Sequence, residues 1–150
     1  MSLDKVAALR RSPLFELLSP AELEVLSELS RPRPLEPGEA VFHAGELGAS
    51  LFVLVEGEVE VVADGRGPSG QVLSVLSAPE SFGEMALVDR EMRSATVRAR
   101  GRALALELTA ENFAAFRKRS RDGFTFVVIN IARVLSGRLR ETSRKLVERS

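Results

Sequence analysis

Residues 45–63 read Gly-Glu-Leu-Gly-Ala-Ser-Leu-Phe-Val-Leu-Val-Glu-Gly-Glu-Val-Glu-Val-Val-Ala. This stretch contains two short apolar runs, Leu51–Val55 and Val59–Ala63, with Gly57 between them. Short runs that are rich in β-branched residues and bounded by glycine are typical of β-strands. Similar runs, separated by Gly, Pro and Asp, occur at 40–42, 72–76, 95–97 and 103–108. Their close and regular spacing predicts an antiparallel sandwich, roll or barrel across residues 31–108.

Helices are predicted on both sides of these strands. The segment Ser19-Pro20-Ala21-Glu22 combines an N-cap serine, a proline at the first helical position and a capping-box glutamate, and it predicts a helix over 20–29. A shorter helix is expected at 3–10. Thr109 is expected to cap a helix over 110–119, and Gly123 to separate it from a long helix over about 124–148.

The predicted fold class is therefore mainly β with flanking helices (α+β). We expect a single domain over 1–150, with N-terminal helices at 3–30, an antiparallel β-roll or jelly roll at 31–108 and C-terminal helices at 109–148. A length of 150 residues matches the usual size of one domain, and 45% apolar with 28% charged residues is ordinary for a soluble protein.

Composition also limits the function classes. No apolar run is long enough to span a bilayer, and the first residues lack the layout of a signal peptide, so we expect no membrane association and a cytoplasmic location. Without cysteine there are no disulfides and no thiol chemistry. A single histidine and the absence of a Gly-x-Ser-x-Gly motif argue against an enzyme and against a metal site.

The net charge is zero, but the charges are unevenly distributed. Residues 117–150 hold ten Lys and Arg residues against three acidic ones. A basic helix of this kind can bind nucleic acid or another anionic partner, and it can equally be a solvated helix face. We favour the solvated face and expect no direct DNA binding by this chain.

A candidate anion site begins at Gly83. A glycine followed by good helix formers can make one helical turn whose free N–H groups point at an anion. Arg93 follows ten residues later, and its planar guanidinium matches the oxygens of a phosphate. Glu84 can only accept hydrogen bonds when it is ionised, so it suits a hydroxyl. Together these groups predict a ligand with an anionic end beside a hydroxyl, such as a ribose phosphate.

The same residues also have a purely structural interpretation. Gly83 would then form a turn, and Glu84 and Arg93 a surface ion pair of little energetic consequence. Phe82 and Leu87 would belong to the core. Spacing alone leaves both interpretations open.

The segment Phe82-Gly83-Glu84-Met85-Ala86-Leu87, with Arg93-Ser94-Ala95 after it, resembles the phosphate-binding cassette of cyclic nucleotide-binding domains. This family includes the bacterial catabolite activator protein and the regulatory subunits of cAMP-dependent protein kinase. The distance from Gly83 to Arg93 matches the family, and residues 45–59 are similar to its second signature. The resemblance covers roughly residues 12–145. Pro79 departs from it, because the family usually has glycine there, and this affects the turn that leads into the cassette.

The resemblance implies a role for each matching residue. Glu84 would bind the ribose 2′-hydroxyl, and Arg93 would pair with the cyclic phosphate. The remaining implied ligand-binding residues are Gly83 and Met85 within the cassette, the amides of Ala86 and Leu87, the hydroxyl of Ser94, Leu73 and Leu76 facing the purine, Arg138 near the phosphate, and Thr142 and Ser143 at the base. The last two fit an exposed helix end equally well.

The implied function is that of a cyclic nucleotide sensor with no other cofactor. The cassette would close on the nucleotide, and the C-terminal helix would cap the base and carry the signal to an unknown effector protein. Ser94 offers a hydroxyl that could meet the amino group of a syn guanine, whereas Thr142 and Ser143 resemble an adenine reader, and we favour cAMP over cGMP as the ligand. The apolar seam of that helix would allow a homodimer. Two alternatives are a ligand-sensing fragment of a catabolite-activator-like transcription regulator without its helix-turn-helix domain, and a degenerate interaction module that binds no nucleotide.

Overall fold

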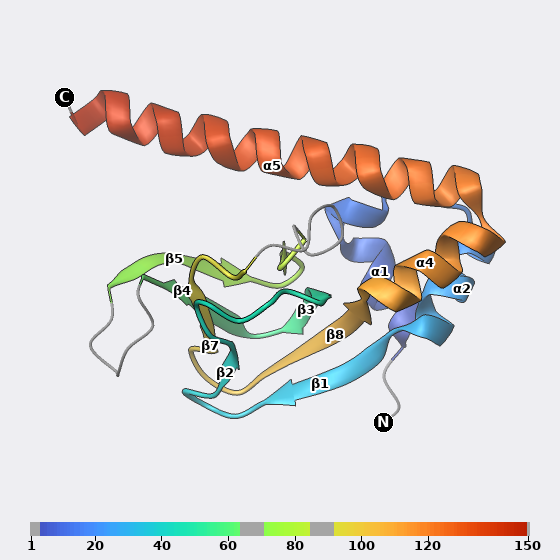
Figure 1. Ribbon diagram of the computed structural model, residues 1–150, viewed down its shortest axis with the longest axis horizontal. Helices are drawn as coiled ribbons and strands as arrows, with labels where there is room; N and C mark the ends of the chain where they lie inside the picture. The colour runs from blue at the N-terminus through green and yellow to red at the C-terminus, as the bar shows by residue number, and fades with distance from the viewer. Residues whose placement is uncertain (1–3, 64–70, 85–91, 150) are drawn as a thin grey trace.

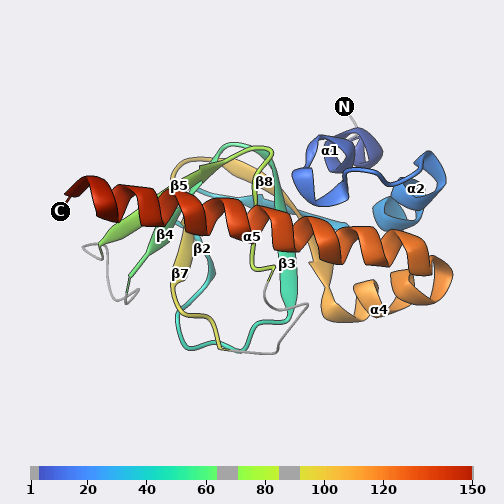
Figure 2. The same cartoon turned by 90° about the horizontal axis from the view of Figure 1, so that it is seen from above.

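The computed structural model describes residues 4–63, 71–84 and 92–149. Helices α1, α2 and α4 gather at one end of a β-roll, and the long helix α5 crosses over the strands (Figures 1 and 2). The predicted class, antiparallel β-structure with flanking helices and a long C-terminal helix, is confirmed. The elements are α1 (Lys5–Arg11), the 3-10 helix η1 (Pro13–Phe15), α2 (Pro20–Leu29), β1 (Arg31–Leu35), β2 (Ala40–Phe42), β3 (Ser50–Glu56), β4 (Glu58–Val62), β5 (Val72–Ser77), β6 (Ser81–Phe82), β7 (Thr96–Ala99), β8 (Ala103–Thr109), α4 (Ala110–Arg119) and α5 (Arg121–Arg149).

The strands form two four-stranded antiparallel sheets in the orders β1-β8-β3-β6 and β2-β7-β4-β5. Strand β1 contains Pro32 and Pro34 and lies at the edge of its sheet. Proline has no N–H to donate to a ladder, so an edge is where a strand with two prolines can be accommodated. Helix α2 ends just before it, as the prolines predict.

The position of strand β3 between two hydrophobic cores explains why its sequence contains a continuous apolar run. Leu51 and Val53 belong to a core under the helices, whereas Phe52 and Leu54 belong to a second core between the two sheets. Successive side chains of a strand point to opposite faces, so a strand that is covered on both faces must be apolar throughout.

The predicted break at Gly123 is wrong. Helix α4 ends at Arg119, Ser120 separates the helices, and Gly123 lies in the first turn of α5, where its N–H donates to Ser120 Oγ at 3.2 Å. A Cβ atom at position 123 would lie 2.8 Å from Phe116 Cζ and 2.5 Å from Glu22 Oε2. Glycine is therefore needed here for the close approach of α5 to α4 and α2.

A buried asparagine anchors the N-terminal half of α5. Asn130 is 1% exposed, and its Nδ2 donates to Leu14 O at 3.0 Å and Glu16 O at 2.8 Å. Val127 and Ile131 on the same helix are buried in the core beside η1. Further along, Leu139 and Leu146 are exposed. None of the helices in the described segments is long and apolar enough to cross a membrane.

Glu22 joins the start of α2 to the start of α5, and it predicts a pH dependence of stability. Its Oε2 accepts from Ser120 Oγ at 2.6 Å and its Oε1 from Ser19 N at 2.8 Å, and these bonds lower its pKa below the ordinary 4.5. A carboxyl whose pKa is lower in the folded state stabilises the fold above its unfolded pKa, and this stabilisation disappears as the pH falls through the folded value.

We therefore expect Glu22→Gln to lower the free energy of unfolding at neutral pH by about 0.5 kcal/mol, the difference between a charge-assisted and a neutral hydrogen bond. The difference from the unaltered protein should shrink as the pH falls below 4.5. Urea unfolding at a series of pH values measures this. Glu24→Gln, on the exposed face of the same helix, is the control and should show no such trend. Parallel pH curves for the Glu22 variant and the unaltered protein would refute the role.

Candidate functional site

A cavity of about 340 Å³ collects half of the predicted site residues. Its walls come from β4, β5 and β7, from the segments before and after residues 85–91, and from α5. The predicted residues that line it are Leu76, Gly83, Glu84, Arg93, Ser94 and Arg138. Residues more than 50 positions apart thus meet at one place.

The Arg93 guanidinium lies at the base of this cavity. Its Nη1 donates to Gly83 O at 3.2 Å and its Nη2 to Ser50 O at 2.7 Å. The backbone of Arg93 also pairs with the other signature segment, because Gly45 N donates to Arg93 O at 2.8 Å and Arg93 N donates to Glu46 O at 2.6 Å. The two motifs that were read separately in the sequence are therefore hydrogen-bonded to each other.

The electrostatics of Arg93 favour an anion. Burial lowers its pKa, and the nearby charges of Glu84 and Glu46 oppose that shift. The arginine stays charged, because its ordinary pKa is far above neutral. Within the described segments no carboxylate lies in ion-pair distance of it. A partly desolvated cation in this state is stabilised when a phosphate binds to it.

Gly83 adopts a conformation that only glycine takes readily. Its φ is +79°, and a Cβ atom there would lie 2.9 Å from Ser50 O and 3.0 Å from Arg93 Nη1. The turn lets its carbonyl reach Arg93 and leaves Glu84 pointing into the cavity. Any other residue would push the arginine away from its acceptors.

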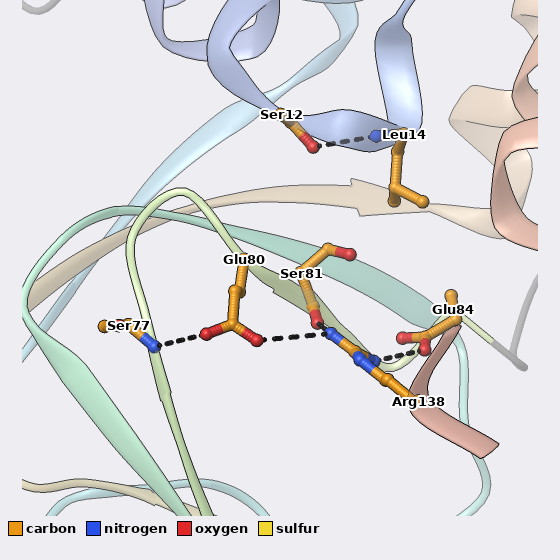
Figure 3. Close-up of polar contacts among 7 residues, drawn as sticks. All are labelled: Ser12, Leu14, Ser77, Glu80, Ser81, Glu84 and Arg138. Atoms are coloured by element: carbon orange, nitrogen blue, oxygen red, sulfur yellow. Dashed lines mark hydrogen bonds and ion pairs between the residues drawn. The ribbon is translucent and has the colours of Figure 1, made fainter. Parts of the chain in front are cut away.

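Glu84 is paired with the C-terminal helix. Its side chain is buried, and its Oε1 accepts from Arg138 Nη1 at 2.7 Å, while Arg138 Nη2 donates to Ser81 O at 2.5 Å (Figure 3). Glu80 lies 4.0 Å from Arg138 and accepts from Ser77 N at 3.2 Å (Figure 3). The structural interpretation required a surface ion pair between Glu84 and Arg93. Glu84 pairs with Arg138 instead. Phe82, by contrast, is in the core as that interpretation held.

Leu73 does not line the cavity, and its contact with a purine stays a prediction. It is 57% exposed, and Ser74 and Leu76 face the cavity instead. The register of β4 with β5 shifts at this point, from Val61 opposite Ser74 to Val62 opposite Val72, which leaves Leu73 as an extra residue. Residues three apart also cannot share one face of a regular strand. That period of two was visible in the sequence.

Thr142 and Ser143 lie on an exposed part of α5 and do not line the cavity. Thr142 Oγ1 donates to Arg138 O at 3.0 Å, within the helix itself. In the single chain they therefore occupy an exposed helix end, and their contact with a base stays a prediction. Met85, Ala86 and Leu87 lie outside the described residues.

Sequence reasoning missed Phe42, Val61 and Ser74 as cavity residues. Val61 and Ser74 are opposite each other on β4 and β5, which a prediction of the pairing register would have shown. Phe42 ends a three-residue strand, and nothing in its spacing relates it to Arg93. Its ring lies 3.9 Å from the Arg93 guanidinium carbon. In the described segments no group of three acidic or histidine side chains is placed to hold a metal ion.

Comparison with known protein families shows to which family this chain belongs. The family model of the cyclic nucleotide-binding domain matches residues 32–120, more than half of the chain. The chain belongs to this family. The resemblance inferred from residues 82–95 and 45–59 is thereby confirmed.

Two relatives of this cyclic nucleotide-binding domain are named for cAMP. The chain is 32% identical over 138 residues to the cyclic AMP receptor protein of Thermus thermophilus, and this match covers 92% of the chain and 62% of that protein. It is 43% identical over 89 residues to the cAMP-dependent protein kinase regulatory subunit of Mycosarcoma maydis, which covers 59% of this chain and 17% of that protein. The chain thus spans less than two thirds of the length of these relatives.

Solved structures agree with the fold. The crystal structure of the Thermus thermophilus catabolite activator protein superposes with a TM-score of 0.74 at 32% identity, over 89% of this chain and 61% of that one. A cyclic nucleotide-binding domain from Methylobacillus flagellatus superposes with a TM-score of 0.84 over 97% of this chain and 82% of that one, but at 20% identity it shows a common fold alone.

Proposed function

We propose that this domain is a cAMP sensor that binds the nucleotide in the 340 Å³ cavity and signals through α5. The observation that carries the proposal is the convergence of Arg93 and Glu84 on one cavity from the two ends of the segment 83–93. A cation and a carboxylate side by side match a cyclic phosphate joined to a ribose. No catalytic role is part of the proposal.

The phosphate would bind at Arg93. Among the described residues, the carbonyls of Gly83 and Ser50 accept from two of the five N–H groups of this guanidinium, and the other three have no acceptor there and can bind phosphate oxygens. Ser94 is exposed at the cavity and offers a hydroxyl beside them. These contacts are charge-assisted and are therefore the strongest in the proposed complex.

The ribose would bind at Glu84. Oε1 of this carboxylate is held by Arg138, and within the described segments Oε2 accepts no hydrogen bond. A ribose 2′-hydroxyl can donate to Oε2 without displacing Arg138. The carboxylate would then contact ligand and α5 at once, which gives binding a direct route to the helix.

The base would lie against the apolar wall formed by Leu76, Val61 and Val97. Thr142 and Ser143 would reach it only after α5 moves, or from a second copy of the chain. Such a homodimer would pair the exposed apolar positions Leu139 and Leu146 of α5. The preference for cAMP over cGMP is supported by relatives that are named for cAMP.

Calorimetric titration tests the function. We expect cAMP to bind more tightly than cGMP, 2′-deoxy-cAMP to bind about tenfold or more weakly because Glu84 loses its hydroxyl donor, and adenosine to give no measurable heat. The absence of heat with both cAMP and cGMP at millimolar concentration would refute the proposal. Equal binding of cAMP and 2′-deoxy-cAMP would refute the role of Glu84.

A second candidate is the ligand-sensing part of a longer transcription regulator. It is favoured by the match to 62% of the Thermus thermophilus receptor protein. Both candidates share the same ligand site, and in neither does this chain itself bind DNA. A module without ligand is disfavoured, because Glu84 and Arg93 still face a cavity large enough for a nucleotide.

A further inference from the structure

The Arg93 guanidinium is packed closely against an aromatic ring and two glycines, and we call the space that these three residues leave for it the slot. Its Cζ is 3.9 Å from the centroid of the Phe42 ring. Cβ atoms built on Gly48 and Gly83 would lie 3.1 Å from Cζ and 3.0 Å from Nη1, respectively. The two glycines, the glycine wall of the slot, therefore leave no room for a side chain beside the guanidinium.

The aromatic wall supplies what a carboxylate would otherwise supply. A cation over the face of a ring is attracted by the negative face of the π-system, and this attraction grows as water is excluded. Phe42 is buried and tilts against Phe52 and Phe82 at centroid distances of 6.1 Å in both cases. Those two rings hold its face toward Arg93. The ring attracts the cation without neutralising it, and within the described segments no carboxylate lies in ion-pair distance of the guanidinium, so its charge is available to a phosphate.

The glycine wall restricts the orientation of the guanidinium. Two carbonyl acceptors fix one edge of the group, since Nη1 and Nη2 donate to Gly83 O and Ser50 O. The Phe42 ring over the group and the two glycines close to it restrict its rotation further. The remaining N–H groups thus point in a defined direction before any ligand arrives, and pre-organisation of this kind raises affinity.

We propose that Phe42 is a positioning residue for Arg93, and that Gly48 sets the width of the slot in which the phosphate-binding guanidinium is held. This inference rests on the proposed function in one respect, namely that Arg93 meets a phosphate. The slot itself is a property of the ligand-free chain. It assigns binding roles to two residues outside the cassette.

A pair of matched substitutions tests the aromatic wall. Phe42→Leu should weaken cAMP binding about tenfold to thirtyfold, the range that a desolvated cation–π contact supports. Phe52→Leu removes a ring from the same three-ring cluster that does not contact Arg93, and we expect a change of less than about threefold. Equal weakening by both variants would overturn the proposal, because it would show a general effect of core packing.

Fluorination separates electrostatics from shape. Replacing Phe42 by 3,4,5-trifluorophenylalanine keeps the ring in place but removes the negative electrostatic potential over its face, so cAMP binding should weaken severalfold. The same replacement at Phe52 should leave binding unchanged. Unchanged binding after fluorination at position 42 would contradict a cation–π role.

The glycine wall has its own control. Gly48→Ala should weaken cAMP binding severalfold, because the added Cβ meets the guanidinium at 3.1 Å. Gly101→Ala adds the same methyl group where no atom lies within 4 Å, and it should bind like the unaltered protein. Equal affinities for the two alanine variants would remove Gly48 from the proposal.

A measurement without ligand keeps this inference separate from the proposed function. 15N relaxation of Arg93 Nε in the free protein should show an ordered side chain in the unaltered protein and in Phe52→Leu, and a mobile one in Phe42→Leu. If no cyclic nucleotide binds, the proposed function fails while relaxation still decides whether the slot orders Arg93. If nucleotide binds and Arg93 Nε is equally ordered in all three proteins, the positioning role is wrong.

Discussion

Arg93→Leu is expected to weaken cAMP binding by about thirtyfold to several thousandfold, which corresponds to about 2–5 kcal/mol. Leucine fills the space beside Phe42 but offers neither the charge nor the three remaining N–H groups. In the described part of the cavity the cationic residues are Arg93 and Arg138, and Arg138 is paired with Glu84. Without Arg93, the phosphate would therefore meet no unpaired cation there. Calorimetric titration with cAMP measures the loss.

Arg98→Leu is the matched control for this substitution. Arg98 is also a half-buried arginine, but it pairs with Glu60 at 2.9 Å and does not line the cavity. Its replacement should leave the affinity for cAMP within about threefold of the unaltered value. Arg93→Lys keeps the charge without the planar fork, so its affinity should lie between those of leucine and arginine. Binding by Arg93→Leu that equals that of the Arg98 variant would show that the phosphate binds elsewhere.

Asn130→Asp is expected to lower the free energy of unfolding by about 2–5 kcal/mol at neutral pH. The change replaces an amide that donates to Leu14 O and Glu16 O with a carboxylate that faces the same two carbonyls. At 1% exposure the new charge has little access to water. Burial raises the pKa of such an aspartate, so stability should recover in part as the pH falls and the group is protonated.

The same chemical change at Asn112 is the control. There the side-chain Oδ1 accepts from Thr109 N at 3.0 Å and from Thr109 Oγ1 at 2.7 Å, so a carboxylate can take its place. A negative charge in the first turn of α4 is also favourable. Asn112→Asp should therefore leave the free energy of unfolding unchanged or raise it slightly in urea unfolding. Similar losses for both variants would contradict the donor role of Asn130.

Local signals in the sequence predicted much of the fold. Ser19 and Glu22 form a capping box at the start of α2. Thr109 forms a second one at the start of α4, with Asn112 as its partner. Such caps depend on residues three positions apart, so a sequence contains all the information that they need. Most strands of the roll were visible for the same reason, because a short apolar run bounded by turn residues is a local property.

Parts of the site were also predicted. Gly83, Glu84 and Arg93, which the resemblance of one short segment to the family's cassette singled out, do line one cavity. Leu73 lies outside the cavity, and the period of two already separated it from Leu76 in the sequence. The register shift that makes Leu73 an extra residue of β5 was not visible there, because it arises from pairing with β4. The helix boundary was wrongly predicted at Gly123, because glycine is needed there to avoid contact with Glu22 of α2 and Phe116 of α4, and not to end a helix.

By itself, the sequence determined the helix caps, the class of the roll, the motif that resembles the cassette, and the order of six strands, but it did not indicate β1 or β6. Only the tertiary structure decided that Arg138 pairs with Glu84, 54 residues away, and that Phe42 lies against Arg93, 51 residues away. Asn130 fixes α5 against η1, and Arg138 follows eight residues later, about 12 Å further along the helix axis. Which turn of α5 reaches the cavity is thus set by packing between distant segments, and no local pattern encodes that distance.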